Sequence, residues 1–245
     1  MWYNFISSRF KNDFFKFMNY GYFSDNLNLN LTGDDELERY PIQLYHHVCS
    51  QIDLNGLNVL EVGSGRGGGA SFIARYHNPK TVTGIDISQN AIDLCQNTYN
   101  INNLKFLIGD SENIPFDDNY FDAVVNVESS HCYPSLNKFI NEVNRVLKPG
   151  GSFLYCDLVI TSELEDHLNQ LKNDDLELVN YKDITDNIIK ASDLMTDDRN
   201  NIIKDVKSNF LKKILRSFAA VKGSKIYESF VNRHYKYISL SMKKR

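Results

Sequence analysis

Short runs of apolar and β-branched residues alternate with amphipathic stretches along the middle of the chain. The runs have the length of buried strands, and the stretches between them repeat apolar residues at helical spacing. The predicted strands cover residues 58–62, 81–85, 105–108, 121–125 and 152–156. The predicted helices among them cover residues 70–75, 91–95 and 136–147. This order indicates right-handed βαβ units, and therefore a parallel sheet with helices on both faces.

The two ends of the chain follow other patterns. Apolar residues recur at helical spacing over 10–18, turn-forming residues follow at 19–25, and a second helix is predicted over 43–51. After about residue 160 the strand patterns stop, and the spacing of apolar residues is compatible with helices until about residue 221. The segment 226–242 is aromatic and alternates weakly, which predicts closing strands at the sheet edge.

The chain has 245 residues, 42% of them hydrophobic, and is long enough for one core and an accessory layer. The changes of pattern along it divide it into four parts. The predicted parts are an N-terminal helical cap over 1–55, the core over 56–160, a helical lid and substrate region over 161–221, and closing strands of the core over 222–245.

Charge and composition exclude several classes of protein. With 27 basic and 31 acidic residues the net charge is -4, so no overall positive field exists to hold nucleic acid. No apolar run reaches membrane-spanning length, and the first ten residues lack the pattern of a secretion signal. The four cysteines form no C-x-x-C pair, and no cluster has metal-ligand spacing. We therefore expect a cytoplasmic protein without a metal.

A glycine-rich turn, Glu61-Val-Gly-Ser-Gly-Arg-Gly with two further glycines, joins the first predicted strand to the first predicted helix. Glycines let the backbone turn sharply and approach a ligand without a Cβ in the way. Gly63, Gly65 and Gly68 also satisfy the G-x-G-x-x-G pattern of dinucleotide enzymes. The turn alone therefore fits two classes of ligand.

Acidic residues at the ends of the first three strands favour one of these classes. The carboxylate of Glu61 would face the ammonium of an amino-acid-bearing ligand and would repel a pyrophosphate. Asp86 stands where a ribose acceptor is expected, and Asp110 can accept from an adenine amino group. Each residue alone is also a common turn former or helix cap. Their joint placement indicates one cleft for a ligand that is cationic overall.

Together these motifs resemble the class I methyltransferases that depend on S-adenosylmethionine (SAM). The resemblance covers residues 57–158 and rests on the glycine turn, Asp86, Gly-Asp at 109–110 with Ile-Pro-Phe-Asp-Asp after it, and Val-Leu-Lys-Pro-Gly-Gly at 146–151. It implies a doubly wound, mostly parallel α/β sheet of seven strands, Rossmann-like, whose last strand runs antiparallel.

The resemblance also implies roles for individual residues. The glycines underlie the methionine portion of SAM, Asp86 holds the ribose, and Asp110 and Ser111 meet the adenine. The predicted cofactor-binding residues are Glu61, Gly63, Ser64, Gly65, Gly67, Asp86, Ile87, Asp110, Ser111 and Asn126. A narrower resemblance, carried by residues 126–134 and 67–71, is to the small-molecule O-methyltransferases of polyketide and glycolipid pathways, including the phthiotriol type.

His131 is the predicted general base, because a neutral hydroxyl is a poor nucleophile and histidine has an unperturbed pKa of about 6.5. It follows the fourth predicted strand, which ends over the crevice. Asp157, at the end of the fifth, is predicted to orient the imidazole. The alternative is that His131 bonds a backbone carbonyl in the turn that leads to Pro134.

Tyr22 and Tyr133 are predicted to cover the sulfonium or the acceptor by cation–π attraction, with core packing as the alternative. The leading hypothesis is methylation of a hydroxyl on a small, partly apolar acceptor such as a polyketide, a phenol or a lipid-like molecule. The alternatives are methylation of nitrogen or carbon on the same scaffold, an NAD-dependent oxidoreductase, and a scaffold that binds the cofactor without turnover.

Overall fold

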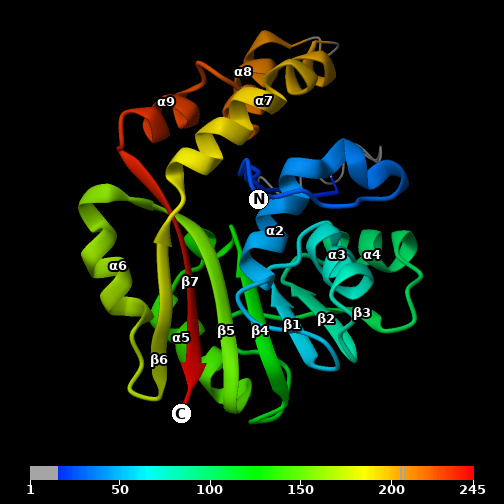
Figure 1. Ribbon diagram of the computed structural model, residues 1–245, viewed down its shortest axis with the longest axis vertical. Coiled ribbons are helices and arrows are strands. Elements are labelled where there is room, and N and C mark those ends of the chain that lie inside the picture. Colours follow the sequence, from blue (N-terminus) through cyan, green and yellow to red (C-terminus); the bar gives the residue numbers. More distant parts are fainter. Residues whose placement is uncertain (1–15, 205, 207) are drawn as a thin grey trace.

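A seven-stranded sheet forms the centre of the protein, as the sequence predicts (Figure 1). The computed structural model describes residues 16–204, 206 and 208–245. The strand order is β3-β2-β1-β4-β5-β7-β6, in which β1 to β5 are parallel and β7 is antiparallel to both its neighbours. The strands are β1 (Asn58–Val62), β2 (Thr81–Asp86), β3 (Leu104–Ile108), β4 (Phe121–Val127), β5 (Leu147–Ile160), β6 (Leu176–Asp183) and β7 (Tyr235–Lys244).

Helices connect these strands, and several begin at a serine whose hydroxyl accepts a hydrogen bond from the first turn. Ser88, Ser135 and Ser224 cap α4, α5 and α9 in this way. The helices are α2 (Arg39–Cys49), α3 (Gly68–Tyr76), α4 (Gln89–Thr98), α5 (Leu136–Val146), α6 (Leu164–Leu171), α7 (Thr185–Ile203), α8 (Asn209–Phe218) and α9 (Lys225–Val231). Short 3-10 helices are η1 (Gly33–Glu38), η2 (Ser130–Cys132) and η3 (Thr161–Glu163).

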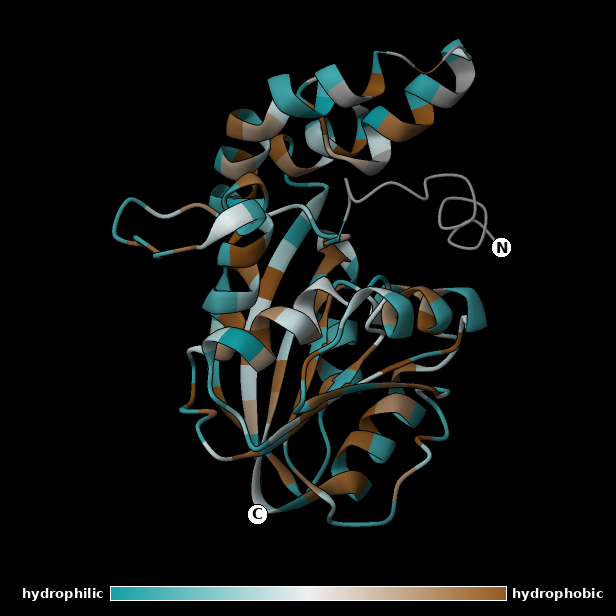
Figure 2. Ribbon diagram, turned by 90° about the vertical axis from the view of Figure 1, so that its right-hand side faces the viewer, coloured by the Kyte–Doolittle hydropathy of each residue, from teal (hydrophilic) through white to brown (hydrophobic). Residues whose placement is uncertain are grey.

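Both faces of the sheet are buried, because successive side chains on a strand point to opposite faces. Val59 packs with α2, α3 and α4 on one face, whereas Leu60 packs with α5 and α6 on the other. On β5, Leu154 lies on the same face as Val59 and Phe153 on the same face as Leu60. Figure 2 shows the resulting hydrophobic colouring of the central strands between more polar helix surfaces.

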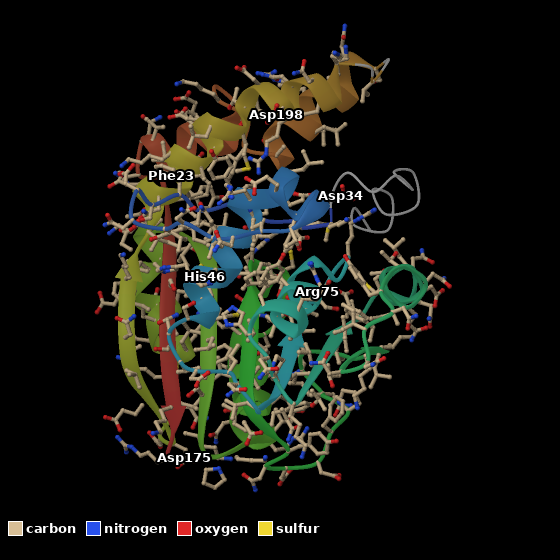
Figure 3. All side chains as sticks on the ribbon, turned by 45° about the vertical axis from the view of Figure 1, so that its right-hand side comes forward. Phe23, Asp34, His46, Arg75, Asp175 and Asp198 are labelled. Atoms are coloured by element: carbon tan, nitrogen blue, oxygen red, sulfur yellow. The ribbon has the colours of Figure 1, made fainter. Side chains whose placement is uncertain are left out.

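Helices α7, α8 and α9 pack on one another beyond one end of the sheet (Figure 1). Because α7 follows β6 and α9 precedes the antiparallel β7, these helices lie at the edge where the parallel strands have their carboxyl ends. The segment before α2 crosses the same edge and is tied to α3, since Asp35 pairs with the guanidinium of Arg75 and accepts from the hydroxyl of Tyr76 at 2.7 Å. Figure 3 shows Arg75 below the segment that carries Asp34.

Three segments differ from the sequence prediction. Strand β6 lies inside the region 161–221, for which only helices were expected, and α9 occupies residues for which a strand was expected. Strand β6 is at the sheet edge, all its residues except Leu176 are exposed, and a register shift between Leu178 and Asn180 interrupts its alternation of apolar and polar residues. The predicted helix over 10–18 falls mainly outside the described residues, and 16–18 are not helical.

The position of β7 between β5 and β6 makes its buried side chains important for stability. Leu240 is fully buried and is paired with both Tyr155 and Tyr181. Leu240→Ala is expected to lower the free energy of unfolding by about 2–5 kcal/mol, because it leaves a cavity in the core. The matched substitution Val179→Ala, at a side chain that is 65% exposed, is expected to change it by less than about 0.5 kcal/mol. Urea unfolding of both variants measures the difference.

Candidate functional site

The glycine turn between β1 and α3 lies at the carboxyl edge of the sheet, where the sequence predicts the cofactor. Gly63 and Gly65 have φ angles of 76° and 51°, in the left-handed region that favours glycine. A Cβ on Gly63 would collide with the hydroxyl of Ser129, and one on Gly65 would lie 2.8 Å from the methyl group of Met18. Both positions therefore favour glycine for conformation, and Gly63 also requires it for space, whereas the flexible Met18 side chain could move away from Gly65.

Three buried polar atoms around this turn have no hydrogen-bond partner among the described residues. They are Oε2 of Glu61, Oγ of Ser64 and Oδ1 of Asn126, and all three residues are at most 5% exposed. A buried polar group without a partner is costly, so such groups usually meet a ligand or an ordered water. All three residues are among the predicted cofactor-binding residues, and Glu61 is the one predicted to face the ammonium of the ligand.

Glu61 is held in place by its other oxygen, Oε1, which accepts from the hydroxyl of Tyr45 at 2.7 Å. Burial raises the pKa of Glu61 to about 8, although the hydrogen bond from Tyr45 opposes the shift. The side chain is therefore mostly neutral at pH 7 until a cation approaches it.

Asp86 organises the turn from the end of β2. Its two oxygens accept from the backbone amides of Gly65 and Ser88, each at 2.9 Å. The next side chain, Ile87, is 74% exposed, which is unusual for a large apolar residue and suits a flat ligand that packs on it. Asp110, beyond the end of β3, is exposed and accepts from the amide of Glu112 at 2.9 Å.

Asn126 and Tyr133 form a polar network on the β4 side of the turn. The amide nitrogen of Asn126 donates to the carbonyl oxygen of Val62 at 2.9 Å and lies 2.8 Å from Oγ of Ser129 and 3.0 Å from the hydroxyl of Tyr133. Tyr133 is half-buried, and its hydroxyl lies so close to Gly63 that a Cβ on that residue would come within 2.8 Å of it. The structure thus brings two predicted site residues together against the glycine turn.

His131 and Asp157 are also brought together. Nδ1 of His131 lies 2.7 Å from Oδ1 of Asp157, which is completely buried in β5. Asp157 also accepts from the hydroxyl of Ser130 at 2.6 Å, from the amide of His131 at 3.1 Å and from the amide of Leu158 at 2.8 Å. Four donors around one buried carboxyl group stabilise its ionised form.

The charge on this pair differs from the sequence expectation of a histidine with an ordinary pKa. Burial favours the neutral imidazole, but the Coulombic attraction and the hydrogen bond of Asp157 outweigh it and raise the pKa of His131 to about 11. The same contacts lower the pKa of Asp157 despite its burial. His131 is therefore an imidazolium at neutral pH.

Tyr22 is buried in the core. Its side chain is 4% exposed and stacks on the ring of His47, with centroids 4.5 Å apart. It belongs to the core cluster between the N-terminal segment and α2, and burial raises its pKa. The structure therefore shows Tyr22 packed in the core, which is the alternative that the sequence left open.

Glu128 is a residue of the site that the sequence prediction did not single out. It follows β4 with a φ angle of 52°, uncommon for a residue other than glycine, and its Oε2 accepts from the hydroxyl of Tyr237 at 2.6 Å. The available signal was a carboxylate directly after a buried strand. The partner tyrosine is 109 residues away in the sequence, so the pairing itself was not visible.

Among the described residues, no three His, Cys, Asp or Glu side chains are grouped to hold a metal ion. In the same part of the chain, no helix combines the length and the apolar character needed to cross a membrane.

Comparisons with known proteins agree with this geometry. A family profile described as a methyltransferase domain matches residues 60–155. A fatty-acid O-methyltransferase from Mycolicibacterium smegmatis is 38% identical over 221 residues, which cover 90% of this chain and 81% of that protein. A phthiotriol/phenolphthiotriol dimycocerosates methyltransferase from Mycobacterium tuberculosis is 37% identical over 226 residues, which cover 92% and 84%.

A solved structure shows the same fold. Geranyl diphosphate C-methyltransferase from Streptomyces coelicolor A3(2), in complex with Mg2+, geranyl diphosphate and S-adenosyl-L-homocysteine, has a TM-score of 0.69 and 16% identity, covering 100% of this chain and 98% of that one. Sheet order and glycine turn thus define a doubly wound α/β protein of the class I methyltransferase fold. Within that class, the chain belongs to the SAM-dependent small-molecule methyltransferases.

The neutral state of Glu61 has a measurable effect on stability. Because the pKa of Glu61 rises from an ordinary 4.5 to about 8 on folding, the folded state binds more protons between these values, and the free energy of unfolding falls as the pH rises through this range. Glu61→Gln removes this loss, so its melting temperature is expected to fall less than that of the wild type between about pH 6 and about pH 8.5. Glu165→Gln, an exposed control on α6, should follow the wild type. Parallel curves for Glu61→Gln and the wild type would contradict the neutral state.

Proposed function

We propose that this protein transfers the methyl group of SAM to an oxygen atom of a lipid-like acceptor. The observation that carries the proposal is the set of buried polar atoms without partners on Glu61, Ser64 and Asn126, beside the pair of His131 and Asp157. One side of the crevice thus fits the amino-acid portion of SAM, and the other side fits the reacting acceptor.

The residues around the glycine turn fit the cofactor by their chemistry. Glu61 and the backbone of the turn would receive the methionine portion, Asp86 the ribose hydroxyls, and Ile87 with Asp110 and Ser111 the adenine. SAM supplies a methyl group on a sulfonium, which transfers in line to a nucleophile while the electron pair of the carbon–sulfur bond leaves on sulfur. The protein contributes alignment, exclusion of water and control of charge.

The lipid-like acceptor is supported by the surroundings of His131 and by the names of the relatives. The rings of Tyr20, Phe230 and Tyr237 lie together, with centroids 5.5–6.4 Å apart, and come from the N-terminal segment, α9 and β7. The two relatives act, by name, on fatty acids and on phthiotriol dimycocerosates. We propose that α7, α8 and α9 form the lid over this region.

The role of His131 depends on the acceptor group. A hydroxyl needs a general base, which only the neutral imidazole supplies, whereas a carboxylate needs no base and is attracted by the imidazolium. The raised pKa of His131 favours the carboxylate, so methylation of a carboxylic acid stands beside the hydroxyl hypothesis.

The cofactor assignment is tested at Asp86. Asp86→Asn removes a charged acceptor and is expected to weaken the binding of S-adenosylhomocysteine by about 10-fold to 100-fold, the value of one hydrogen bond to a charged group. Asp117→Asn, at an exposed aspartate outside the crevice, is the control and should bind as the wild type does. Calorimetry gives both dissociation constants. Wild-type protein that binds NADH but not S-adenosylhomocysteine would disprove the proposal.

The pH dependence of turnover identifies the role of His131. If the acceptor is a hydroxyl, kcat/KM is expected to rise with pH above neutrality, because deprotonation of His131 creates the base. If it is a carboxylate, kcat/KM should instead fall as the imidazolium loses its proton. Asp157→Asn removes the charge that raises the pKa of His131, so it should move either profile to lower pH. A pH profile of kcat/KM that is flat in the wild type and unchanged in His131→Ala would show that His131 takes no part in the reaction.

A further inference from the structure

Glu128 stands where the acceptor is proposed to bind. It follows β4 directly, three residues before His131, and its backbone amide is fixed by a hydrogen bond of 2.7 Å to the carbonyl oxygen of Cys156. The side chain is half-buried among the rings of Tyr20 and Tyr237. The mechanism proposed so far gives this carboxyl group no task.

The two oxygens of Glu128 have different environments. Oε2 accepts from the hydroxyl of Tyr237 at 2.6 Å and from the backbone amide of Tyr20 at 3.0 Å. Oε1 accepts no hydrogen bond from any described residue, and the atom is not fully buried. One oxygen therefore anchors the group, while the other is free of hydrogen bonds and not fully buried.

The charged groups around Glu128 come from several elements. His131 lies on η2, Asp157 on β5 and Arg199 on α7, and each interacts electrostatically with the carboxyl group. Arg199 is only 8% exposed, and within the described residues it donates to the carbonyl oxygens of Ala219 and Asn19 and forms no ion pair. His131 and Arg199 are thus two cations that act on this region; Asp157 is the ionised partner of His131, and Glu38 is a further carboxyl group that interacts with Arg199.

The hydrogen bonds decide where a proton on Glu128 resides. Burial raises the pKa of Glu128 to about 8, although the bond from Tyr237 and the attraction of His131 oppose it, so the carboxyl group is mostly neutral at pH 7. Both donors occupy Oε2, which leaves Oε1 as the position for the proton of the neutral group. In its neutral form Glu128 can therefore donate from Oε1.

We infer that Glu128 binds the acceptor beside His131, that its Oε1 donates a hydrogen bond to the acceptor, and that the acceptor group is the carboxylate of a long-chain acid. This inference rests on the proposed methyl transfer to oxygen. Two donors, Oε1–H and the imidazolium, hold an anion better than a neutral hydroxyl. The carboxylate oxygen forms a bond to the methyl carbon as the carbon–sulfur bond breaks with its electron pair on sulfur. The product is a methyl ester, and Glu128 keeps its proton.

Two substitutions at the same position test this inference. Glu128→Ala removes the donor, so the KM for dodecanoic acid is expected to rise by about 10-fold to 100-fold, the effect of one hydrogen bond to a charged group. Glu128→Gln keeps a donor, its amide N–H, and is expected to stay within about 3-fold of the wild-type KM. The dissociation constant of S-adenosylhomocysteine should be unchanged in both variants, which also shows that they are folded. Glu165→Gln on α6 is the matched control for the loss of a carboxylate.

Dodecan-1-ol, assayed in parallel, separates the two acceptor groups. Wild-type turnover of the acid with little turnover of the alcohol supports the inference. If the KM of Glu128→Ala for dodecanoic acid equals that of the wild type, the role of Glu128 is overturned, whereas the proposed methyl transfer to oxygen is not affected. Preference for the alcohol, with Glu128→Gln as inactive as Glu128→Ala, would make Glu128 a base and overturn its role as a donor. Absence of methyl transfer to both compounds by wild-type protein that binds S-adenosylhomocysteine would overturn the proposed function itself, and the inference with it.

Discussion

Two buried carboxyl groups and one half-buried carboxyl group, at the carboxyl ends of adjacent strands, are the constraint around which the site is built. Glu61 belongs to β1, Glu128 follows β4 and Asp157 lies near the end of β5. These strands are neighbours in the middle of the sheet, so the three groups line one edge. Removing a carboxylate from water is costly, and each group must either find a strong partner or keep its proton.

The partner decides which of these outcomes applies. Tyrosine hydroxyls donate to Glu61 and to Glu128, but a neutral donor does not offset burial, and the pKa of both groups is raised to about 8. Asp157 has an imidazole and three further donors, and its pKa is lowered. The crevice thus holds two neutral carboxyl groups and one ion pair in a single row. In our proposal, the first neutral group receives the amino-acid portion of SAM and the second faces the acceptor.

The path of the chain brings these partners to the edge. Strand β7 enters the sheet antiparallel between β5 and β6, so its first residues lie at the carboxyl edge and deliver Tyr237 to Glu128. The N-terminal segment crosses the same edge and adds the amide of Tyr20, while α7 brings the guanidinium of Arg199. Three segments far apart in the sequence therefore set the charge of one residue.

Local pattern alone indicated the parallel core, the glycine turn and the positions of Glu61, Asp86 and His131 at or after strand ends, because strand alternation, glycine spacing and strand ends are properties of neighbouring residues. It missed β6, since an exposed edge strand is specified by its pairing with β7 and not by its own periodicity. It also gave His131 an ordinary pKa, whereas Asp157 raises it. Only tertiary packing decides that Tyr22 is buried against His47 and that Asp157 is buried beside His131. The physical reason is that desolvation, which shifts the pKa of a group, depends on residues that lie far apart in the sequence.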